Sequence, residues 1–277
     1  MKFKLLAASF VAAMTMSAAS QALVITPEDD GTTLANTILG SGITISNVDY
    51  TGAAGASGTF TGGNASGLSI DKGIVLSSGS AELAQGSNDQ SGATANNGMP
   101  GYAPLTDISG FPTFDATVLK FDFEFDGGVG GDLFFNFVFG SEEYLEWVGS
   151  QFNDVFGFYV DGVNVALTPG SSDPITINTI NASQNSSLFV DNTSGAHNTQ
   201  MDGFTTTLQI VLTGLSAGLH TMEFAIADAG DDALDSWIFI QADSFSDTPV
   251  GVPEPSPFLL LGLGLLGLGL IRRKQAQ

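Results

Sequence analysis

The sequence contains no cysteine and very few basic residues. Without cysteine there are no disulfides, thiolate metal ligands or thiol nucleophiles, so packing, together with any bound metal, must stabilise the chain. Residues 23–250 hold only two of the seven basic residues, Lys72 and Lys120, but every one of the 29 acidic residues except Glu254. These 28 carboxylates and two lysines give a formal charge of −26. Such a charge disfavours nucleic acid and anionic lipid as partners and favours cations.

Residues 1–22 are predicted to be a signal peptide. The segment has two lysines within its first four residues, continues with the apolar run 5–13, and ends with small residues at Ser20 and Ala22. The alternative, an N-terminal anchor helix, requires a longer apolar run than this one. We therefore expect export across the inner membrane and cleavage after Ala22.

Residues 251–277 are predicted to be a sorting and transmembrane tail. A polar motif comes first, followed by fourteen apolar residues at 258–271 and then by a basic cluster. The motif is Pro253, Glu254 and Pro255, and the cluster is Arg272, Arg273 and Lys274. A helix of fourteen residues rises about 21 Å, which is short for a hydrocarbon core of about 30 Å. The basic cluster is expected to stay cytoplasmic, which leaves the preceding domain outside.

This three-part tail closely resembles the PEP-CTERM sorting signal. The resemblance implies cleavage near Pro253 by an exosortase, a membrane-embedded cysteine protease, in a Gram-negative bacterium that makes exopolysaccharide. We expect the protein to be anchored in the membrane through the tail before processing, and to reach the cell surface or extracellular matrix afterwards. The alternative is an ordinary C-terminal anchor that is never cut.

Residues 23–250 are predicted to form one all-β domain. Residues 119–125 alternate between apolar and charged side chains, and residues 133–139 are apolar on nearly both faces, as in a central strand of a sandwich. The dipeptide Asp161-Gly162 predicts a hairpin between strands 155–160 and 163–167. Further strands are expected at 43–48, 58–61, 73–76, 206–213, 221–227 and 236–242.

The remaining segments of the domain indicate how these strands are connected. A short helix is expected at 32–39, and the polar, Gly- and Asn-rich residues 80–113 predict a long loop. Turns spaced about ten residues apart without helical periodicity indicate an antiparallel β-sandwich, jelly-roll-like, with long Gly-rich loops. The tail adds a separate C-terminal hydrophobic helix.

Two acidic clusters lie next to apolar strands. In the first, Glu142, Glu143 and Glu146 follow a strand and Asp154 precedes the next one; in the second, four aspartates lie between residues 228 and 235. Calcium takes six to eight oxygen ligands, so such clusters favour a calcium site, although their spacing is not that of an EF-hand. The alternative is solvated turns whose aspartates cap backbone amides. The expected ligands, with Asp235 as first choice, are Glu142, Glu143, Asp154, Asp228, Asp231 and Asp235.

The same motifs resemble the choice-of-anchor L domain. The resemblance rests on FGSEEYLEWVGSQFNDVFGFYVDG at 139–162, DGFTTTL at 202–208 and IADAGDDALDSWIFI at 226–240, and it covers about residues 30–246. This family is a set of bacterial surface domains with interchangeable C-terminal anchors, so it implies export and anchoring but no activity. One departure is the pair Asp231-Asp232, where the family has a single acidic position.

No catalytic motif is visible in the chain. Glu142 with Glu143 or Glu146 has the residue types of a glycosidase pair, but adjacent strand residues point to opposite faces. We therefore expect a non-enzymatic cell-surface or biofilm-matrix protein that is adhesive or associated with exopolysaccharide. Two alternatives remain: a carbohydrate-active enzyme on a lectin-like sandwich, and a purely structural surface component.

Overall fold

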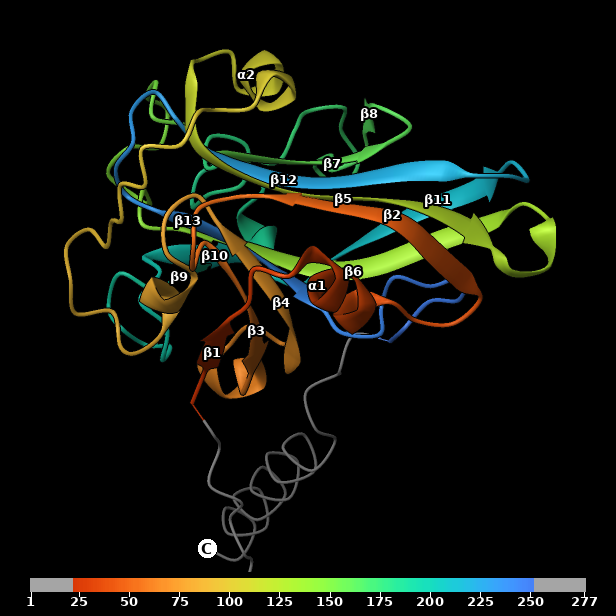
Figure 1. The fold of residues 1–277 in the computed structure, drawn as a ribbon. Coiled ribbons are helices and arrows are strands. Elements are labelled where there is room, and N and C mark those ends of the chain that lie inside the picture. Colours follow the sequence, from red (N-terminus) through yellow and green to blue (C-terminus); the bar gives the residue numbers. More distant parts are fainter. Residues whose placement is uncertain (1–21, 252–277) are drawn as a thin grey trace, which may run out of the picture.

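Two antiparallel sheets stack face to face in a computed structural model that describes residues 22–251 (Figure 1). The sandwich predicted from the alternating pattern is confirmed. The predicted signal peptide and sorting tail lie outside the described residues, except for their boundary residues Ala22 and Gly251. Within the described part of the chain, no helix is both long enough and apolar enough to cross a membrane.

The first sheet has eight strands and the second has five. The first runs in the order β1 (Val24–Pro27), β3 (Ser57–Thr61), β4 (Lys72–Ser77), β13 (Ser236–Gln241), β6 (Gly131–Ser141), β10 (Gly203–Thr205) and β9 (Phe189–Asp191), and β11 (Leu208–Leu215) also pairs with β6. The second runs in the order β2 (Ile43–Thr51), β5 (Thr113–Phe125), β12 (His220–Ala229), β7 (Val155–Val160) and β8 (Val163–Asn164).

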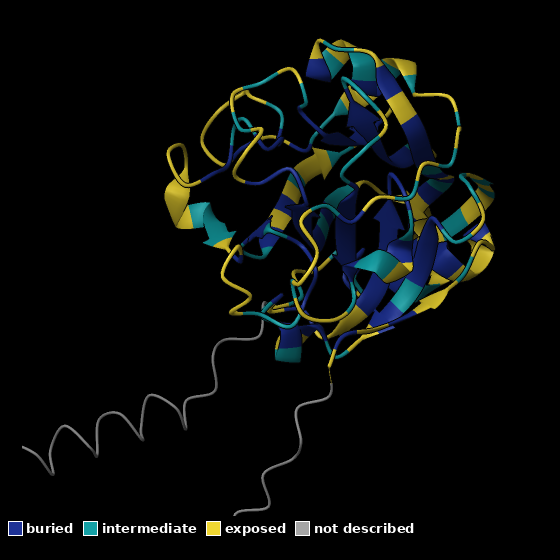
Figure 2. Ribbon diagram, turned by 90° about the vertical axis from the view of Figure 1, so that its left-hand side faces the viewer, coloured by how far each residue is buried: buried dark blue, intermediate teal, exposed yellow. Residues whose placement is uncertain are grey.

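Phenylalanine side chains fill the space between the sheets. Phe135 of the first sheet contacts Phe158 and Phe224 of the second, with ring centroids 5.1 and 5.4 Å apart. The alternation in β5 turns Phe121 and Phe123 into this core and Lys120, Asp122 and Glu124 away from it. Buried residues accordingly concentrate in the strands, and exposed ones in the loops (Figure 2).

Short helices cover parts of the two sheets. Helix α1 (Gly31–Ile38), predicted at 32–39, begins after Asp30, whose side chain accepts a hydrogen bond from the Thr32 amide. Helix α2 (Ala103–Ser109) lies over the outer face of the second sheet (Figure 1). The remaining helical elements are 3₁₀ turns: η1 (Gly63–Ser66), η2 (Ala81–Ala84), η3 (Asp126–Gly128) and η4 (Ser186–Leu188).

Two sequence predictions of local structure were wrong in detail. The expected loop 80–113 contains η2 and α2, neither of which has enough apolar periodicity to be visible in the sequence. The hairpin at Asp161-Gly162 forms, with φ of 50° and 79°, but its second strand is only β8 rather than 163–167. The reason is that the side chain of Asn164 accepts the amides of Phe158 and Ala166, which ends the regular backbone pairing.

Candidate functional site

Strand ends from both sheets meet at one end of the sandwich. Strands β6 and β12 end there, and β7 and β13 begin there, because Ser141 pairs with Ser236 and Ala227 pairs with Val155. The structure therefore gathers five of the six predicted ligand residues at this end, each no more than 2 % exposed: Glu142, Glu143, Asp154, Asp228 and Asp235. The sixth, Asp231, lies in the turn after β12, is half-buried, and accepts the amide of Ala233.

Hydrogen bonds at this end join the two sheets. The amide of Glu142 donates to the carbonyl of Asp235 at 3.1 Å within the first sheet. The hydroxyl of Ser236 donates to the carboxylate of Asp154 at 2.6 Å, and the amide of Asp154 donates to the carboxylate of Glu143 at 3.2 Å. Both of these bonds run between elements of different sheets. The acidic groups therefore sit at the junction of the two layers.

Two of the carboxylates hold the long segment 80–113 across this end. The carboxylate of Asp235 accepts hydrogen bonds from the backbone amides of Ser80 and Ala95, at 3.0 and 2.9 Å. The carboxylate of Glu142 accepts one from the backbone amide of Ala93 at 2.9 Å. These contacts are amide caps of the kind that the alternative interpretation of the acidic clusters expects.

A further buried carboxylate, Asp115, was missed by the sequence analysis. It is 2 % exposed and accepts the amides of Asn97, at 2.8 Å, and Met99. Asp115 is an isolated acid at the start of β5, so a search for dense acidic clusters does not find it. Its signal in the sequence is a single aspartate at the beginning of an apolar alternating strand.

Hydrogen-bond donors are unevenly distributed among the buried carboxylates. Asp154 accepts the amide of Ala229 at 2.9 Å in addition to the Ser236 hydroxyl. Asp228 accepts no hydrogen bond at either oxygen, and one oxygen of Glu142 also lacks a partner. The two lysines of the described residues form ion pairs elsewhere, Lys72 with Asp243 at 3.1 Å and Lys120 with Glu223 at 2.8 Å.

Burial makes these carboxyls resist ionisation. It raises the pKa of Glu143 to about 10, and that of Glu142 and of Asp154 to about 8. The pKa of Asp228 lies well above its usual value because of burial and of the neighbouring Asp154. The pKa of Asp235 rises only to about 6, since burial is partly offset by its two amide donors. Glu142, Glu143, Asp154 and Asp228 are therefore mostly neutral near pH 7 unless a positive charge compensates their ionised forms, whereas Asp235 is mostly ionised there.

No preformed metal cage is present in the described residues, because no three or more His, Cys, Asp or Glu side chains are arranged to hold an ion. The structure brings five predicted ligands to one end of the sandwich, but their role as ligands stays a prediction.

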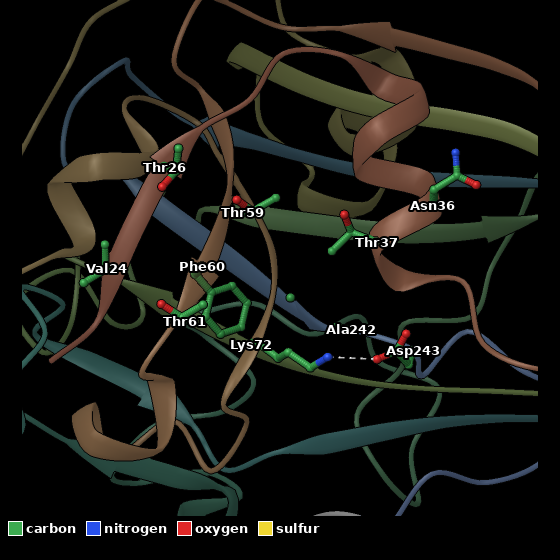
Figure 3. A pocket seen from close by; sticks show the side chains of 11 residues that line it. Val24, Thr26, Asn36, Thr37, Thr59, Phe60, Thr61, Lys72, Ala242 and Asp243 are labelled. Atoms are coloured by element: carbon green, nitrogen blue, oxygen red, sulfur yellow. Dashed lines mark hydrogen bonds and ion pairs between the residues drawn. The ribbon is translucent and has the colours of Figure 1, made fainter. Parts of the chain in front are cut away.

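A cavity of about 300 Å³ lies at the opposite end of β4 and β13 (Figure 3). Strands β1 and β3, helix α1 and the residues after β13 form its walls. Its lining is rich in hydroxyl and amide groups, and the Lys72–Asp243 ion pair spans part of it. The polar side chains that line it are Thr26, Asn36, Thr37, Thr59, Thr61, Lys72 and Asp243.

Family profiles match both the domain and the C-terminal tail. The choice-of-anchor L domain profile matches residues 24–246, and the PEP-CTERM protein-sorting motif matches residues 251–274. Comparison with curated proteins and with solved structures gave no significant match. The sorting motif implies export, anchoring through the C-terminal tail, and processing by an exosortase. The chain belongs to the choice-of-anchor L domain family.

Proposed function

We propose that the mature domain, residues 23–250, is a non-enzymatic component of the cell surface or biofilm matrix, released from its membrane tail by exosortase. The position of the sorting motif is the observation that carries this proposal. The side chain of Asn136 in β6 donates to the carbonyl of Val250 at 3.0 Å, so chain contacts of the fold extend almost to the motif. A cut near Pro253 leaves both sheets and their cores intact.

Intact-mass analysis of protein extracted from the cell surface tests the processing step. The mature chain is expected to begin at residue 23 and to end near residue 253. Deletion of the gene for the exosortase is the matched control and is expected to leave the tail attached. A surface form that still ends at Gln277 in the presence of the exosortase would show that the tail is a permanent anchor.

Burial argues against catalysis by the acidic cluster. A glycosidase needs two carboxyl groups that reach the scissile bond from either side. Glu142 and Glu143 are buried, and each accepts a hydrogen bond from a backbone amide: Glu142 from Ala93 in the segment 80–113, and Glu143 from Asp154. The purified mature domain is therefore expected to release no reducing sugar from polysaccharide. Steady release that disappears in Glu142→Gln would contradict this expectation and favour the glycosidase alternative.

The polar cavity supports association with exopolysaccharide. Hydroxyl and amide side chains that converge in a concave site supply the directional hydrogen bonds that fix a polar ligand such as a sugar. Screening the mature domain against a glycan array is expected to identify a ligand, and Thr61→Val in β3 is expected to weaken its binding. Thr213→Val, an equally exposed threonine on β11 outside the cavity, is the control. Equal glycan binding by the two variants would show that the sugar binds outside the cavity. If the unchanged domain binds no glycan, the alternative of a purely structural surface component is favoured.

Calcium is proposed to stabilise the mature domain. A domain with 28 carboxylates and two lysines has strong internal repulsion that a bound divalent cation relieves. Extracellular calcium sites have Kd values of about 10⁻⁴–10⁻³ M, so 1 mM calcium stabilises the native state by about 0.4–1.4 kcal/mol. Thermal melts in EDTA, in millimolar calcium, and in magnesium at matched ionic strength measure this gain. Equal gains from calcium and magnesium would indicate charge screening alone.

A further inference from the structure

Asp228 is a buried carboxylate that no described residue neutralises. Its side chain is 1 % exposed, and neither oxygen has a hydrogen-bond partner. The hydroxyl of Ser78 lies close enough to favour the ionised form in part, and the carboxyl of Asp154 lies close enough to share a proton with Asp228. Burying an ionised carboxylate without a partner is one of the largest electrostatic costs in a protein interior. The position therefore requires a proton or a cation.

The titratable groups that face Asp228 are all acidic. Asp154 lies opposite Asp228, because Ala227 pairs with Val155 in the ladder between β12 and β7. Glu143, just after the end of β6, lies next to Asp154, whose backbone amide donates to its carboxylate. Further negative charge comes from Asp115 on β5, Asp231 after β12 and Asp235 before β13.

We propose that Glu143, Asp154 and Asp228, here called the inner triad, bind one calcium ion at the junction of the two sheets. This inference rests on the calcium stabilisation proposed above and specifies its site. It moves the centre of the expected site from Asp235, the first choice from the sequence, to Asp228, because the two backbone amides that Asp235 accepts favour its ionised form without any ion. Asp228, by contrast, has no hydrogen bond to lose when its carboxylate turns toward an ion.

The composition of the inner triad suits calcium better than magnesium. Calcium accepts flexible arrangements of carboxylate, carbonyl and hydroxyl oxygens, whereas magnesium demands near-octahedral geometry and keeps several waters. The triad is enclosed and leaves little room for a hydrated ion, since each member is no more than 1 % exposed. Because no cage is preformed, binding requires rotation of the acidic side chains, and an entering ion must also displace the protons that neutralise the three carboxyls.

An ion at this position also has a structural consequence. Glu143 follows β6 of the first sheet, whereas Asp154 directly precedes β7 and Asp228 lies in β12, both strands of the second sheet. One ion held by all three residues therefore links the two layers of the sandwich. Calcium binding is expected to slow the separation of the sheets as well as to raise the melting temperature.

Asp228→Asn tests the site in the mature domain, with Asp231→Asn as the matched control on the adjacent turn. Calorimetric titration of the unchanged domain with calcium chloride is expected to show one ion per chain. Asp228→Asn is expected to lose at least ten-fold in calcium affinity and to melt at about the same temperature as the unchanged domain in EDTA, since the protonated carboxyl and the amide are both neutral. Asp231→Asn is expected to retain the affinity within two-fold.

Glu143→Gln provides a second test in case Asp228→Asn does not fold, and it is expected to weaken calcium binding to a similar extent. Calcium binding that survives in both triad variants would place the ion elsewhere and overturn the inner triad, while leaving calcium stabilisation itself intact. Absence of any calcium binding by the unchanged domain would overturn both proposals, and protons alone would then neutralise Asp228.

Discussion

Gly79 illustrates how closely single residues are fitted around the acidic end of the sandwich. A Cβ atom at this position would lie 1.9 Å from a carboxylate oxygen of Asp235, which is far inside van der Waals contact. The carboxylate cannot move away without releasing the amides of Ser80 and Ala95. The glycine is therefore required by close approach, since its φ is not in the left-handed region.

Gly79→Ala is expected to destabilise the domain by about 2–3 kcal/mol, because overpacking and lost hydrogen bonds to a buried carboxylate act together. Urea unfolding followed by Trp fluorescence measures the change. A loss below about 0.5 kcal/mol for Gly79→Ala would mean that the segment 80–113 adjusts freely around the new methyl group.

At the scale of elements, β6 shows why one strand needs apolar residues on both faces. Its Phe135, Phe137 and Phe139 face the core between the sheets, whereas Val138 faces a second cluster on the outside of the first sheet. That outer cluster is covered in part by the 3₁₀ turn η2. The nearly continuous apolar run of β6 predicted a central strand. Val138 is apolar because the cluster that it joins on the outside of the first sheet is shielded in part from water by η2.

His220, the first residue of β12, ties that strand to the β7–β8 hairpin. Its two ring nitrogens lie 2.7 Å from the carboxylate of Asp161 and 2.9 Å from the carbonyl of Ser216. Because both partners are acceptors, only the protonated ring donates to both. Burial lowers the pKa of His220, but these two hydrogen bonds outweigh burial and leave the pKa above its usual value.

A raised pKa in the folded state means that the folded protein binds this proton more tightly than the unfolded chain. The contribution of His220 is therefore fully present below a pH of about 6.5 and is lost as the pH rises through the folded-state pKa. His220→Gln is expected to lower the melting temperature more at pH 5.5 than at pH 9. Equal losses at the two pH values would mean that the ring contributes by packing against Phe123 rather than by its charge.

For the molecule as a whole, the excess of carboxylates on the mature domain, a formal charge of −26, dominates its solution behaviour. Ionised surface carboxylates repel one another over distances that salt screens. Sodium chloride is therefore expected to raise the melting temperature, with most of the gain below about 0.2 M, where the Debye length shortens to about 8 Å. Thermal melts between 0.01 and 1 M salt measure this. A gain that keeps rising linearly to 1 M would indicate exclusion of salt from apolar surface instead.

The sequence by itself determined the features that depend on neighbouring residues and on composition. Alternating side chains predicted the strands, Asp161-Gly162 predicted the hairpin, and the terminal motif predicted the sorting signal. Local pattern is sufficient for these features because strand periodicity and turn geometry are set within a few residues. The sequence also showed the excess of acidic residues and their clustering between the strands that end before Glu142 and begin after Asp154.

Only the tertiary structure decided what each acidic residue does. Asp235 and Ser80 are 155 residues apart, and Glu142 and Ala93 are 49 apart, so their hydrogen bonds exist only once both sheets and the segment 80–113 are in place. The same assembly leaves Asp228 without a donor. Whether a carboxylate is neutralised depends on which backbone amides reach it through space, and spacing along the chain does not contain that information.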